Sequence, residues 1–391
     1  MDKRAKYKHI LLRTISYILV AALSSFLTML LTGNVNKLAQ LEWIIKTHFV
    51  GEVDETAMGD AAASAMIGAL GDRWSYYISA EDYEAFQEKK TNSYVGIGIT
   101  IQQREDKTGF DILKVEPDGP AERAGIQAGD ILVEVEGTSM ADVNSDVPSS
   151  MIRGIPGTSV QVAVLRQGEK LEFQVRRAKV ESVVAEGRML DHKIGYVKIR
   201  NFNTNCADQT LAAVEALLEQ GAQALLFDVR NNSGGYVDEM NEILDYLLPE
   251  GDLFRSVRYN GQEEVDTSDA DCLEVPMAVL VNEYSYSAAE FFAAALQEYD
   301  WAVVVGTPTT GKGYFQNTFN LVDGSAVGLS VGQYYTPNGI SLAEQGGMTP
   351  DVTVEVDEET FYMIYAEALP VSEDPQLLQA QNLLNEEMSA Q

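Results

Sequence analysis

Two residues in the C-terminal half of the chain have the types and the spacing that amide hydrolysis needs. Ser287 lies where a small-residue turn passes into a helical run, and Lys312 lies between two glycines after the next apolar segment. A serine hydroxyl is a poor nucleophile until a neighbouring base takes its proton. A lysine can be that base when burial disfavours its charged form and lowers its pKa. The pair therefore indicates a serine nucleophile with a lysine base.

Histidine is the more usual base, but the three histidines stand in unsuitable places. His9 precedes a long apolar run, His48 lies in an N-terminal helical stretch, and His192 lies in an Asp-His-Lys turn. None has an acidic partner in a glycine-framed loop, so the sequence disfavours a Ser-His-Asp triad. A structural interpretation of the pair stays open, because many serines before helices are N-caps and many lysines between glycines are solvated.

The segments around the pair predict an α/β core. Apolar strands are expected at residues 276–281 and 301–305, with a helix over 287–299 between them. Strands at 194–199 and 224–229 flank a helix over 208–220, which makes a βαβ unit. A further strand is expected at 325–335, and helices at 360–369 and 374–386.

A glycine-rich turn over residues 231–235 directly follows the second strand of that unit. Such turns expose backbone N–H groups, which suits an oxyanion hole. A phosphate-binding loop is the rival interpretation, and the missing G-x-x-x-x-G-K-[ST] spacing disfavours it.

Residues 94–179 have the pattern of a PDZ domain. GPAERAGIQAGDILVEVEG, over 119–137, predicts a short helix, a glycine turn and an alternating strand. The opening YVGIGI resembles the loop whose N–H groups capture a peptide C-terminal carboxylate, beside a strand edge that pairs with the peptide. The peptide-binding residues expected on this basis are Val95, Gly96, Ile97, Gly98 and Ile99.

Several further motifs lie in one order along the chain. They are DVRNNSGG over 228–235, the turn before Ser287, the Gly-Lys-Gly loop, DGSA over 323–326, QYYTPNG over 333–339 and MTPDV over 348–352. Together they resemble the C-terminal processing (tail-specific) serine proteases of the bacterial type, which carry a PDZ domain. The resemblance covers nearly all of residues 40–391.

The resemblance implies a role for each site residue. Ser287 would be the nucleophile, Lys312 the general base and Gln316 the residue that holds the lysine amine. The oxyanion hole would combine the Ala288 N–H with a glycine N–H from the turn that contains Gly234 and Gly235.

The chain departs from the family pattern at three positions near the site. Tyr284 and Tyr286 stand where the family usually has small residues, and Ser233 replaces a frequent proline. The tyrosines are expected to narrow the site and to leave the serine–lysine pair intact.

The N-terminal segment predicts a membrane anchor. Residues 3–13 are rich in lysine and arginine, and the following residues 14–32 contain no charge. Nineteen helical residues span about 28 Å, close to the thickness of the hydrocarbon layer. The basic flank should stay in the cytoplasm, so a single-pass protein of the cell membrane with its bulk outside is expected. A cleaved signal peptide is the alternative, and no clear A-x-A site supports it.

These segments together predict an α/β protease core with a helical N-terminal region, an inserted mainly-β PDZ domain and one transmembrane helix. The expected divisions are a cytoplasmic basic segment (1–13), an anchor (14–32), a helical region (35–92), the PDZ domain (93–179), a Ser/Lys protease core (180–357) and C-terminal helices (358–391).

Composition narrows the choice of partners. The net charge of −31 argues against nucleic acid, because phosphates would be repelled. Cys206 and Cys272 make no disulfide framework, although one bridge stays open. Metal and cofactor motifs such as H-E-x-x-H, C-x-x-C and the calcium loop are missing, so no metal and no cofactor are expected.

The predicted function is therefore a membrane-anchored serine endopeptidase that binds protein C-terminal tails and cleaves exported or membrane-associated proteins. The resemblance also implies a homodimer through the N- and C-terminal helices. The alternative is a catalytically inactive PDZ-bearing adaptor, which the intact Ser287, Lys312 and Gln316 disfavour. Arg153 is a candidate link between the PDZ domain and the core, and an exposed arginine beside a turn is its plainer interpretation.

Overall fold

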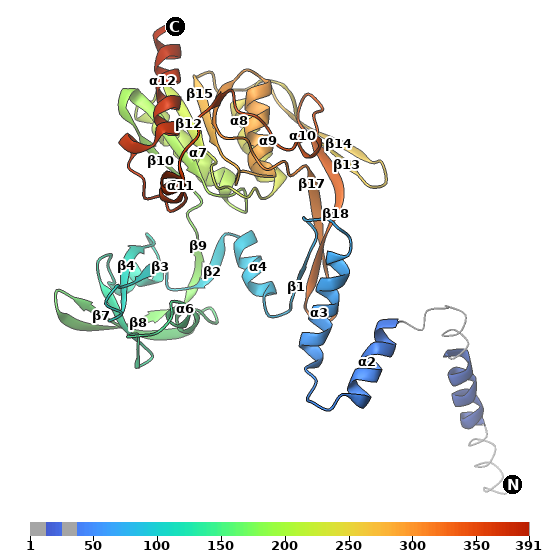
Figure 1. Cartoon of the computed structure of the whole chain (residues 1–391). Coiled ribbons are helices and arrows are strands. Elements are labelled where there is room, and N and C mark those ends of the chain that lie inside the picture. Colours follow the sequence, from blue (N-terminus) through green and yellow to red (C-terminus); the bar gives the residue numbers. More distant parts are fainter. Residues whose placement is uncertain (1–12, 26–36, 391) are drawn as a thin grey trace, which may run out of the picture. The chain divides into compact units, whose positions relative to one another are not determined.

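The computed structural model describes residues 13–25 and 37–390 (Figure 1). The chain forms two compact units, residues 1–71 and 72–391. In the first unit, residues 13–25 are helical, and α2 (Lys37–His48) and α3 (Glu55–Gly68) follow. Asp54 begins α3 as its N-cap, since its carboxylate accepts a hydrogen bond from the Ala57 N–H. Neither α2 nor α3 contains a buried residue.

The expected membrane anchor falls partly outside what the structure describes. Residues 26–32 of the predicted span, and residues 1–12 before it, lie outside the described residues. Within residues 13–25 and 37–390, no helix has both the length and the apolar character needed to cross a membrane.

The PDZ region of the second unit is a small sheet with its own core. The strand order is β3-β4-β5-β7-β8, with β6 beside β5. The strands are β3 (Ile99–Gln103), β4 (Phe110–Val115), β5 (Ile131–Val135), β6 (Thr138–Ser139), β7 (Ser159–Arg166) and β8 (Glu169–Arg176), and the helices are α5 (Pro120–Ala124) and α6 (Asp146–Ile152). The predicted alternation is confirmed, because Val160, Val162 and Val164 are buried together.

A two-stranded ribbon carries the chain into and out of this region. β2 (Ser93–Gly96) pairs antiparallel with β9 (Ala178–Glu181). Before the ribbon lies α4 (Tyr83–Lys90), and Asn92 after it donates to the Asn201 side chain and to the Thr204 carbonyl. The PDZ region is thus an insertion whose two ends lie side by side.

A six-stranded sheet forms the centre of the protease core. It comprises β10 (Ala185–Met189), β11 (Ile194–Ile199), β12 (Ala224–Asp228), β15 (Met277–Val281), β16 (Ala302–Gly306) and β19 (Val352–Thr353), in that spatial order. β11 to β19 run parallel and β10 antiparallel. Strands buried on both faces read as continuous apolar runs, which is why their sequence positions were predictable.

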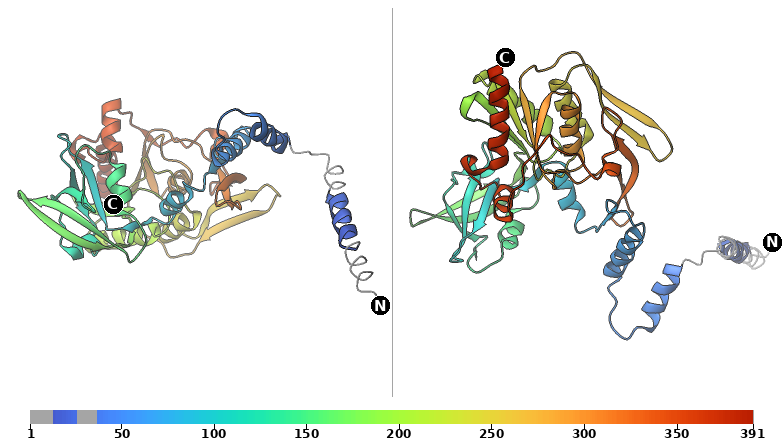
Figure 2. Two further views of the ribbon diagram at one scale, coloured as in Figure 1. Left: turned by 90° about the horizontal axis from the view of Figure 1, so that it is seen from below. Right: turned by 45° about the horizontal axis from the view of Figure 1, so that its top comes forward.

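Helices cover both faces of this sheet (Figures 1 and 2). On one face α7 (Cys206–Glu219), α8 (Val237–Leu247) and α9 (Ala288–Glu298) bury the larger apolar cluster. On the other face α12 (Pro375–Ala390) packs Leu377, Ala380 and Leu384 against Ala278 and Leu280 of β15. The sheet is thus the middle layer of an α/β sandwich.

A second, antiparallel sheet stands beside the core and was not predicted. It comprises β1 (Tyr76–Ile78), β13 (Gly251–Arg258), β14 (Glu263–Ser268), β17 (Tyr314–Asn320) and β18 (Ala326–Tyr335). The expectation of helix throughout residues 35–92 was wrong, because β1 falls within that range. Tyr76 pairs with Gly328 in β18, a partner too distant in sequence for local pattern to reveal.

The C-terminal part completes the core. α10 (Leu342–Gln345) and α11 (Glu358–Tyr365) precede α12. The two predicted terminal helices are confirmed with shifted ends. Asp374 caps α12, since its Oδ1 accepts hydrogen bonds from the backbone N–H groups of Gln376 and Leu377.

Candidate active site

Ser287 lies at the N-terminus of α9, and its backbone conformation is unusual. Its φ is 60° and its ψ is −130°, a combination that residues other than glycine rarely adopt. Such conformations cost about 1–3 kcal/mol and persist only where the surroundings impose them. The side chain is only 8% exposed. The serine is therefore held in a defined place at the positive end of a helix dipole.

Two turns at the carboxyl ends of neighbouring parallel strands are bonded together beside Ser287. The Asn231 N–H donates to Asn282 Oδ1 over 3.0 Å, and Asn282 Nδ2 donates to Asn231 Oδ1 over 2.9 Å. Ser285 Oγ donates to the Val229 carbonyl over 2.8 Å. These bonds fix the glycine-rich turn after β12 against the turn that ends at Ser287.

The glycine turn approaches Ser287 so closely that only glycine fits. A Cβ built on Gly234 would lie 2.8 Å from Ser287 Cβ and 2.9 Å from the Ala288 nitrogen, and the φ of Gly234 is +85°. Gly235 is as tightly confined, because a Cβ there would lie 2.2 Å from the Phe202 carbonyl carbon. The glycines are thus required both by close approach and, at Gly234, by backbone conformation.

The backbone N–H groups of the expected oxyanion hole differ in whether they already donate a hydrogen bond within the protein. The Gly234 N–H donates to Asn232 Oδ1 over 2.8 Å, so it is engaged within its own turn. Asn232 is fully buried and is itself held by the Ile199 carbonyl. Within the described part of the chain, the Gly235 and Ala288 N–H groups have no acceptor. Of the expected donors, these two are free to meet a substrate oxygen.

Glu290 organises both catalytic candidates and was not predicted as a site residue. It is fully buried. Its Oε2 accepts from the Ser287 N–H over 2.9 Å and from the Lys312 N–H over 2.8 Å. Its Oε1 accepts from Thr309 Oγ1 over 2.5 Å and from the Gly311 N–H over 2.6 Å. A sequence signal existed, because a lone glutamate three residues after a helix-starting serine matches a capping box.

Aromatic rings surround the Lys312 ammonium. Its Nζ lies 5.0 Å from the centroid of the Trp74 ring and 5.8 Å from that of Tyr286. The two rings contact each other at a centroid distance of 5.8 Å. Tyr286, expected to narrow the site, is therefore part of the wall around the lysine.

The pKa of Lys312 is lowered from 10.5 to about 8. Burial is the largest cause, and repulsion from the Lys90 ammonium adds to it. The carboxylates of Glu290 and Asp72 act in the opposite direction. A lysine with this pKa is partly neutral near pH 8 and can accept a proton there.

Gln316 lies in β17 and does not hold the lysine amine in this structure. Its Nε2 donates to the Tyr314 carbonyl over 3.0 Å and to Ser330 Oγ over 3.1 Å. A register shift between β17 and β18 at this point pairs Gln316 with Ser330. Within the described residues, no hydrogen bond joins its side chain to Lys312 Nζ, and its Nε2 is engaged within its own sheet.

Ser287, Lys312 and Gln316 nevertheless line one cavity of about 830 Å³, together with Gly234 and Gly235. Aromatic side chains and two lysines form much of the remaining wall: Tyr76, Tyr83, Phe86, Lys89, Lys90, Tyr236, Phe315 and Tyr334. In the described structure no hydrogen bond joins the Ser287 hydroxyl to Lys312 Nζ. Such bonds are often long in free enzymes and tighten when substrate binds.

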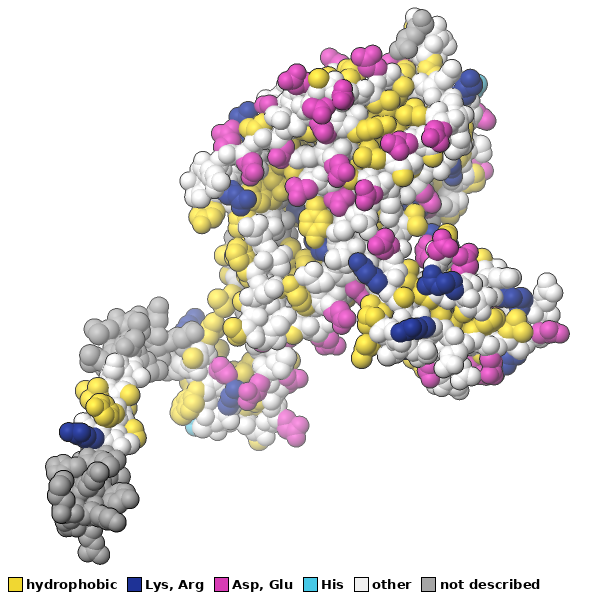
Figure 3. Space-filling view, turned by 180° about the vertical axis from the view of Figure 1, so that it is seen from behind, with side chains coloured by type: hydrophobic (Ala, Val, Ile, Leu, Met, Phe, Trp, Pro, Cys, Tyr) yellow, Lys and Arg dark blue, Asp and Glu magenta, His cyan; other side chains and the backbone are white. Residues whose placement is uncertain are grey.

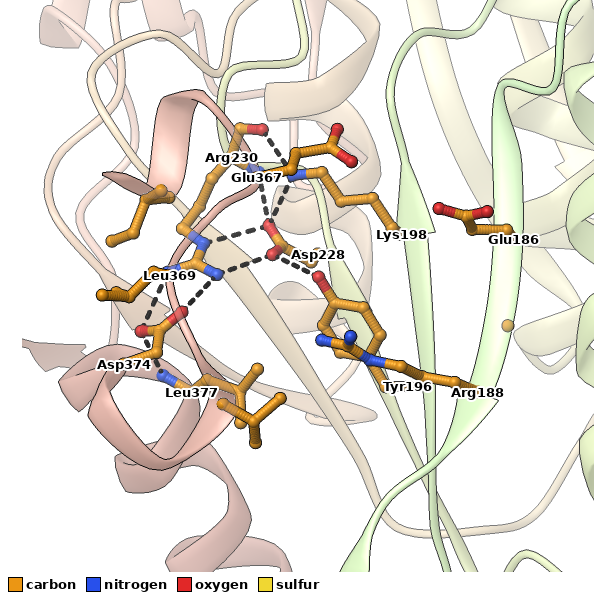
Figure 4. A pocket seen from close by; sticks show the side chains of 13 residues that line it. Glu186, Arg188, Tyr196, Lys198, Asp228, Arg230, Glu367, Leu369, Asp374 and Leu377 are labelled. Carbon is orange, nitrogen blue, oxygen red and sulfur yellow. Dashed lines mark hydrogen bonds and ion pairs between the residues drawn. The ribbon is translucent and has the colours of Figure 1, made fainter. Parts of the chain in front are cut away.

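A buried ionic network supports the glycine turn from behind (Figure 4). Asp228, at the end of β12, accepts from Lys198 over 3.1 Å, and its second oxygen lies 2.7 Å from Arg230 Nη2. The same Arg230 nitrogen lies 2.8 Å from Asp374, the cap of α12. Burial alone would raise the pKa of Asp228, but Arg230 and Lys198 hold it well below its usual value. The network borders a separate cavity of about 390 Å³.

The expected peptide-binding residues of the PDZ domain are divided between two strands and the connection between them. Val95 and Gly96 end β2 and are paired with β9, and Ile99 opens β3. Ile97 is fully buried, and Gly98 has a φ of +79°. β3 is an edge strand of its sheet, so one side is available for pairing with an added strand.

Arg153 makes a contact beyond the PDZ domain. Its guanidinium forms an ion pair with Glu88 on α4 and lies 5.1 Å from the centroid of the Tyr94 ring. Arg153 therefore joins the PDZ domain to α4, the helix before it, and not directly to the protease core as the sequence suggested. Cys206 and Cys272 are both free thiols, so they do not form the bridge that the sequence left open.

Comparisons with known proteins identify the two domains. The model of peptidase family S41 matches residues 193–354, and that of the PDZ domain matches residues 95–176. The chain is 29% identical over 361 residues to the carboxy-terminal processing protease CtpA of Bacillus subtilis (strain 168), covering 87% of this chain and 76% of that protein. It is 29% identical over 347 residues to a probable CtpA-like serine protease of Staphylococcus aureus (strain COL), covering 87% and 69%.

A solved structure shows the same fold. A putative S41 protease from Bacteroides fragilis NCTC 9343 superposes with a TM-score of 0.54 at 19% identity, covering 86% of this chain and 92% of that one. The fold and the matched domains define a serine-type peptidase, a hydrolase. The chain joins a peptidase family S41 domain to a PDZ domain, and it is similar to the carboxy-terminal processing proteases.

Proposed function

We propose that this peptidase works as an endopeptidase with a Ser287–Lys312 dyad. The observation that carries the proposal is that both residues line one cavity and their backbone N–H groups share one buried carboxylate, that of Glu290. The lowered pKa of Lys312 supports its role as base. An adaptor without activity would have no need of a strained serine beside a partly neutral lysine.

In the proposed reaction, neutral Lys312 takes the proton of Ser287 as Oγ attacks the scissile carbonyl carbon. The carbonyl oxygen becomes an oxyanion, which accepts hydrogen bonds from the Ala288 and Gly235 N–H groups. The Lys312 ammonium then gives its proton to the leaving amine, and an acyl-enzyme remains. Water, deprotonated by the same lysine, attacks the acyl group and restores Ser287. Substrate binding has to bring the serine and the lysine into hydrogen-bonding distance.

We propose that protein tails reach this site through the PDZ domain. The free side of β3 would pair with the tail, and the loop at Ile97 and Gly98 would meet its terminal carboxylate. The substrates proposed are exported or membrane-associated proteins. A tail peptide that loses affinity on amidation of its carboxyl terminus, measured by fluorescence anisotropy, would support this assignment.

Membrane anchorage remains part of the proposal and rests on the sequence alone. Residues 14–32 carry no charge and follow a basic flank. The test is fractionation of cells that express either the full chain or a chain lacking residues 1–33. Anchorage predicts that only the full chain resists extraction from membranes by carbonate. Equal extraction of both would exclude an uncleaved anchor.

Dimerisation through the N- and C-terminal helices is a further proposal. Leu41, Trp43 and Ile44 of α2 are 49%, 62% and 41% exposed, so they are apolar side chains that a partner could cover. Sedimentation equilibrium of the detergent-solubilised chain would give its mass. A Trp43→Glu variant should shift the equilibrium to the monomer if α2 contributes to the interface.

The central test compares the full chain with Ser287→Ala, Lys312→Met and the double variant, in detergent and with casein as substrate. Fragments are followed by mass spectrometry. Residues that act as one unit are not additive, so each single variant should lose about as much activity as the double variant, at least about 1000-fold. Additive losses would contradict a shared unit, and equal cleavage by all four proteins would exclude the dyad.

A further inference from the structure

Lys90 is a cation in the site cavity, and it has no anionic partner among the described residues. It is the last residue of α4, and its carbonyl accepts hydrogen bonds from Thr204 N–H over 3.3 Å and from Thr204 Oγ1 over 3.2 Å. Its backbone is thus fixed to the core. Its Nζ lies 5.1 Å from the centroid of the Tyr236 ring and 5.9 Å from that of Phe86. Within residues 72–390, the ammonium forms no hydrogen bond and no ion pair.

Lys90 lacks a partner although carboxylates are abundant in the molecule. Acidic residues outnumber basic ones by 59 to 28, and acidic side chains spread over the visible face of the core in Figure 3. Elsewhere in the described structure, Arg153 pairs with Glu88 and Lys198 with Asp228, whereas the cavity that contains Lys90 and Lys312 holds no ion pair to either lysine. Burial lowers the pKa of Lys90, and no carboxylate opposes that effect.

The position of Lys90 places its charge beside the path of a substrate. Tyr236 directly follows Gly235, whose N–H is a proposed oxyanion donor, and Lys90 lines the same cavity as Ser287. Removing a cation from water without a partner is costly, so a bound anion would be strongly favoured there. The rings of Phe86 and Tyr236 would shield such an ion pair from water and strengthen it.

We propose that Lys90 is a specificity-determining residue that binds a carboxylate of the substrate close to the scissile bond. The carboxylate comes either from an aspartate or glutamate side chain or from the chain terminus itself. This assignment rests on the proposed function of the cavity, and it deepens that function by naming a substrate class: peptides that present a carboxylate near the cleavage site.

The experiment uses the full chain and internally quenched peptides in matched pairs. One set exchanges aspartate for asparagine at each position around the cleaved bond, and a second exchanges a free carboxyl terminus for an amide. The ratio of kcat/KM within each pair, measured at one pH, cancels any effect of Lys90 on the reactivity of Lys312. A carboxylate bound by Lys90 should favour the acidic member by about 10- to 100-fold.

Variants of the lysine isolate its contribution. Lys90→Met should abolish the preference, Lys90→Arg should retain it, and Lys90→Glu should favour the neutral member. Lys89→Met is the matched control, because Lys89 lines the same cavity from an exposed position and should leave the ratio unchanged. All of these proteins contain the same PDZ domain. A difference in preference between the wild type and Lys90→Met therefore cannot come from carboxylate binding by the PDZ domain.

Binding to the Ser287→Ala protein gives a readout that does not need catalysis. There, the acidic peptide should bind more tightly than its neutral partner, and a further Lys90→Met change should remove the difference. If the wild type cleaves no peptide while this difference persists, the proposed function fails and the carboxylate site stands. If peptides are cleaved and bound with the same preference with or without Lys90, the carboxylate site is overturned.

Discussion

At the scale of single residues, the base of the proposed dyad depends on its surroundings. Burial and Lys90 lower the pKa of Lys312 to about 8, and only its neutral form accepts a proton. We therefore expect kcat/KM to rise through about pH 8 and to level off above it. In Lys90→Met the repulsion is removed, so the pKa rises and the profile moves to higher pH. Initial rates with a neutral peptide between pH 6 and 10 measure this; coincident profiles would contradict it.

Gly234 gives a second prediction at this scale. The Cβ of Gly234→Ala would meet Ser287 Cβ and the Ala288 nitrogen within 3 Å, so the serine must move. We expect a loss of activity of at least about 100-fold, as for other displaced oxyanion geometry. Circular dichroism should show a folded protein. Gly68→Ala is the control, because its Cβ would meet nothing within 4 Å. Equal activities of Gly234→Ala and Gly68→Ala would show that the turn accommodates the added methyl group without displacing Ser287.

The residue types of the proposed dyad were predictable, but some of their partners were not. Ser287 and Lys312 stand out in the sequence because their local frames, a helix start and a glycine loop, are unusual. Two partners of Glu290, the Gly311 and Lys312 N–H groups, lie on a loop beyond the next strand, and no local spacing encodes them. Gln316 was assigned to the lysine by resemblance, whereas β-sheet register directs its amide to Ser330.

At the scale of elements, Glu290 joins the start of α9 to the loop between β16 and β17. Its two oxygens accept four hydrogen bonds. In Glu290→Gln an amide NH₂ would face N–H donors, and each donor left unsatisfied costs about 1–3 kcal/mol. We expect a lower free energy of unfolding in urea and a large loss of kcat. Thr309→Val removes one of the four donors and leaves the Met348 N–H without its acceptor, so it should also lower stability. Its loss of kcat should be smaller, because the Ser287 and Lys312 N–H groups keep their bonds to Glu290.

The elements themselves were predictable to different degrees. The parallel strands of the core are buried on both faces and read as apolar runs, such as MAVLV over 277–281. β14 reads EEVDTS and lies mostly exposed at the edge of the second sheet, so it gives no apolar alternation. That sheet depends on pairings between distant segments, which composition does not reveal.

At the scale of the whole molecule, the C-terminal helix supports the site from the opposite face of the sheet. Asp374 caps α12 and pairs with Arg230, which adjoins the glycine turn. Removing one charge of a buried pair costs about 3–5 kcal/mol. We therefore expect Asp374→Asn to lower the urea midpoint markedly and to reduce activity. Glu373→Gln, an exposed neighbour, should stay within about 0.5 kcal/mol of the wild type. A similar effect of both changes would exclude the network as a support.

The backbone of Ser287 has a consequence for how this chain varies over generations. A φ of 60° with a ψ of −130° suits glycine better than serine, so a glycine there would relieve strain and stabilise the fold. Drift governed by stability alone would replace the serine. A lineage that keeps the serine is therefore expected to be under selection for the function of its hydroxyl group. Relatives with glycine at this position are expected to have lost that function.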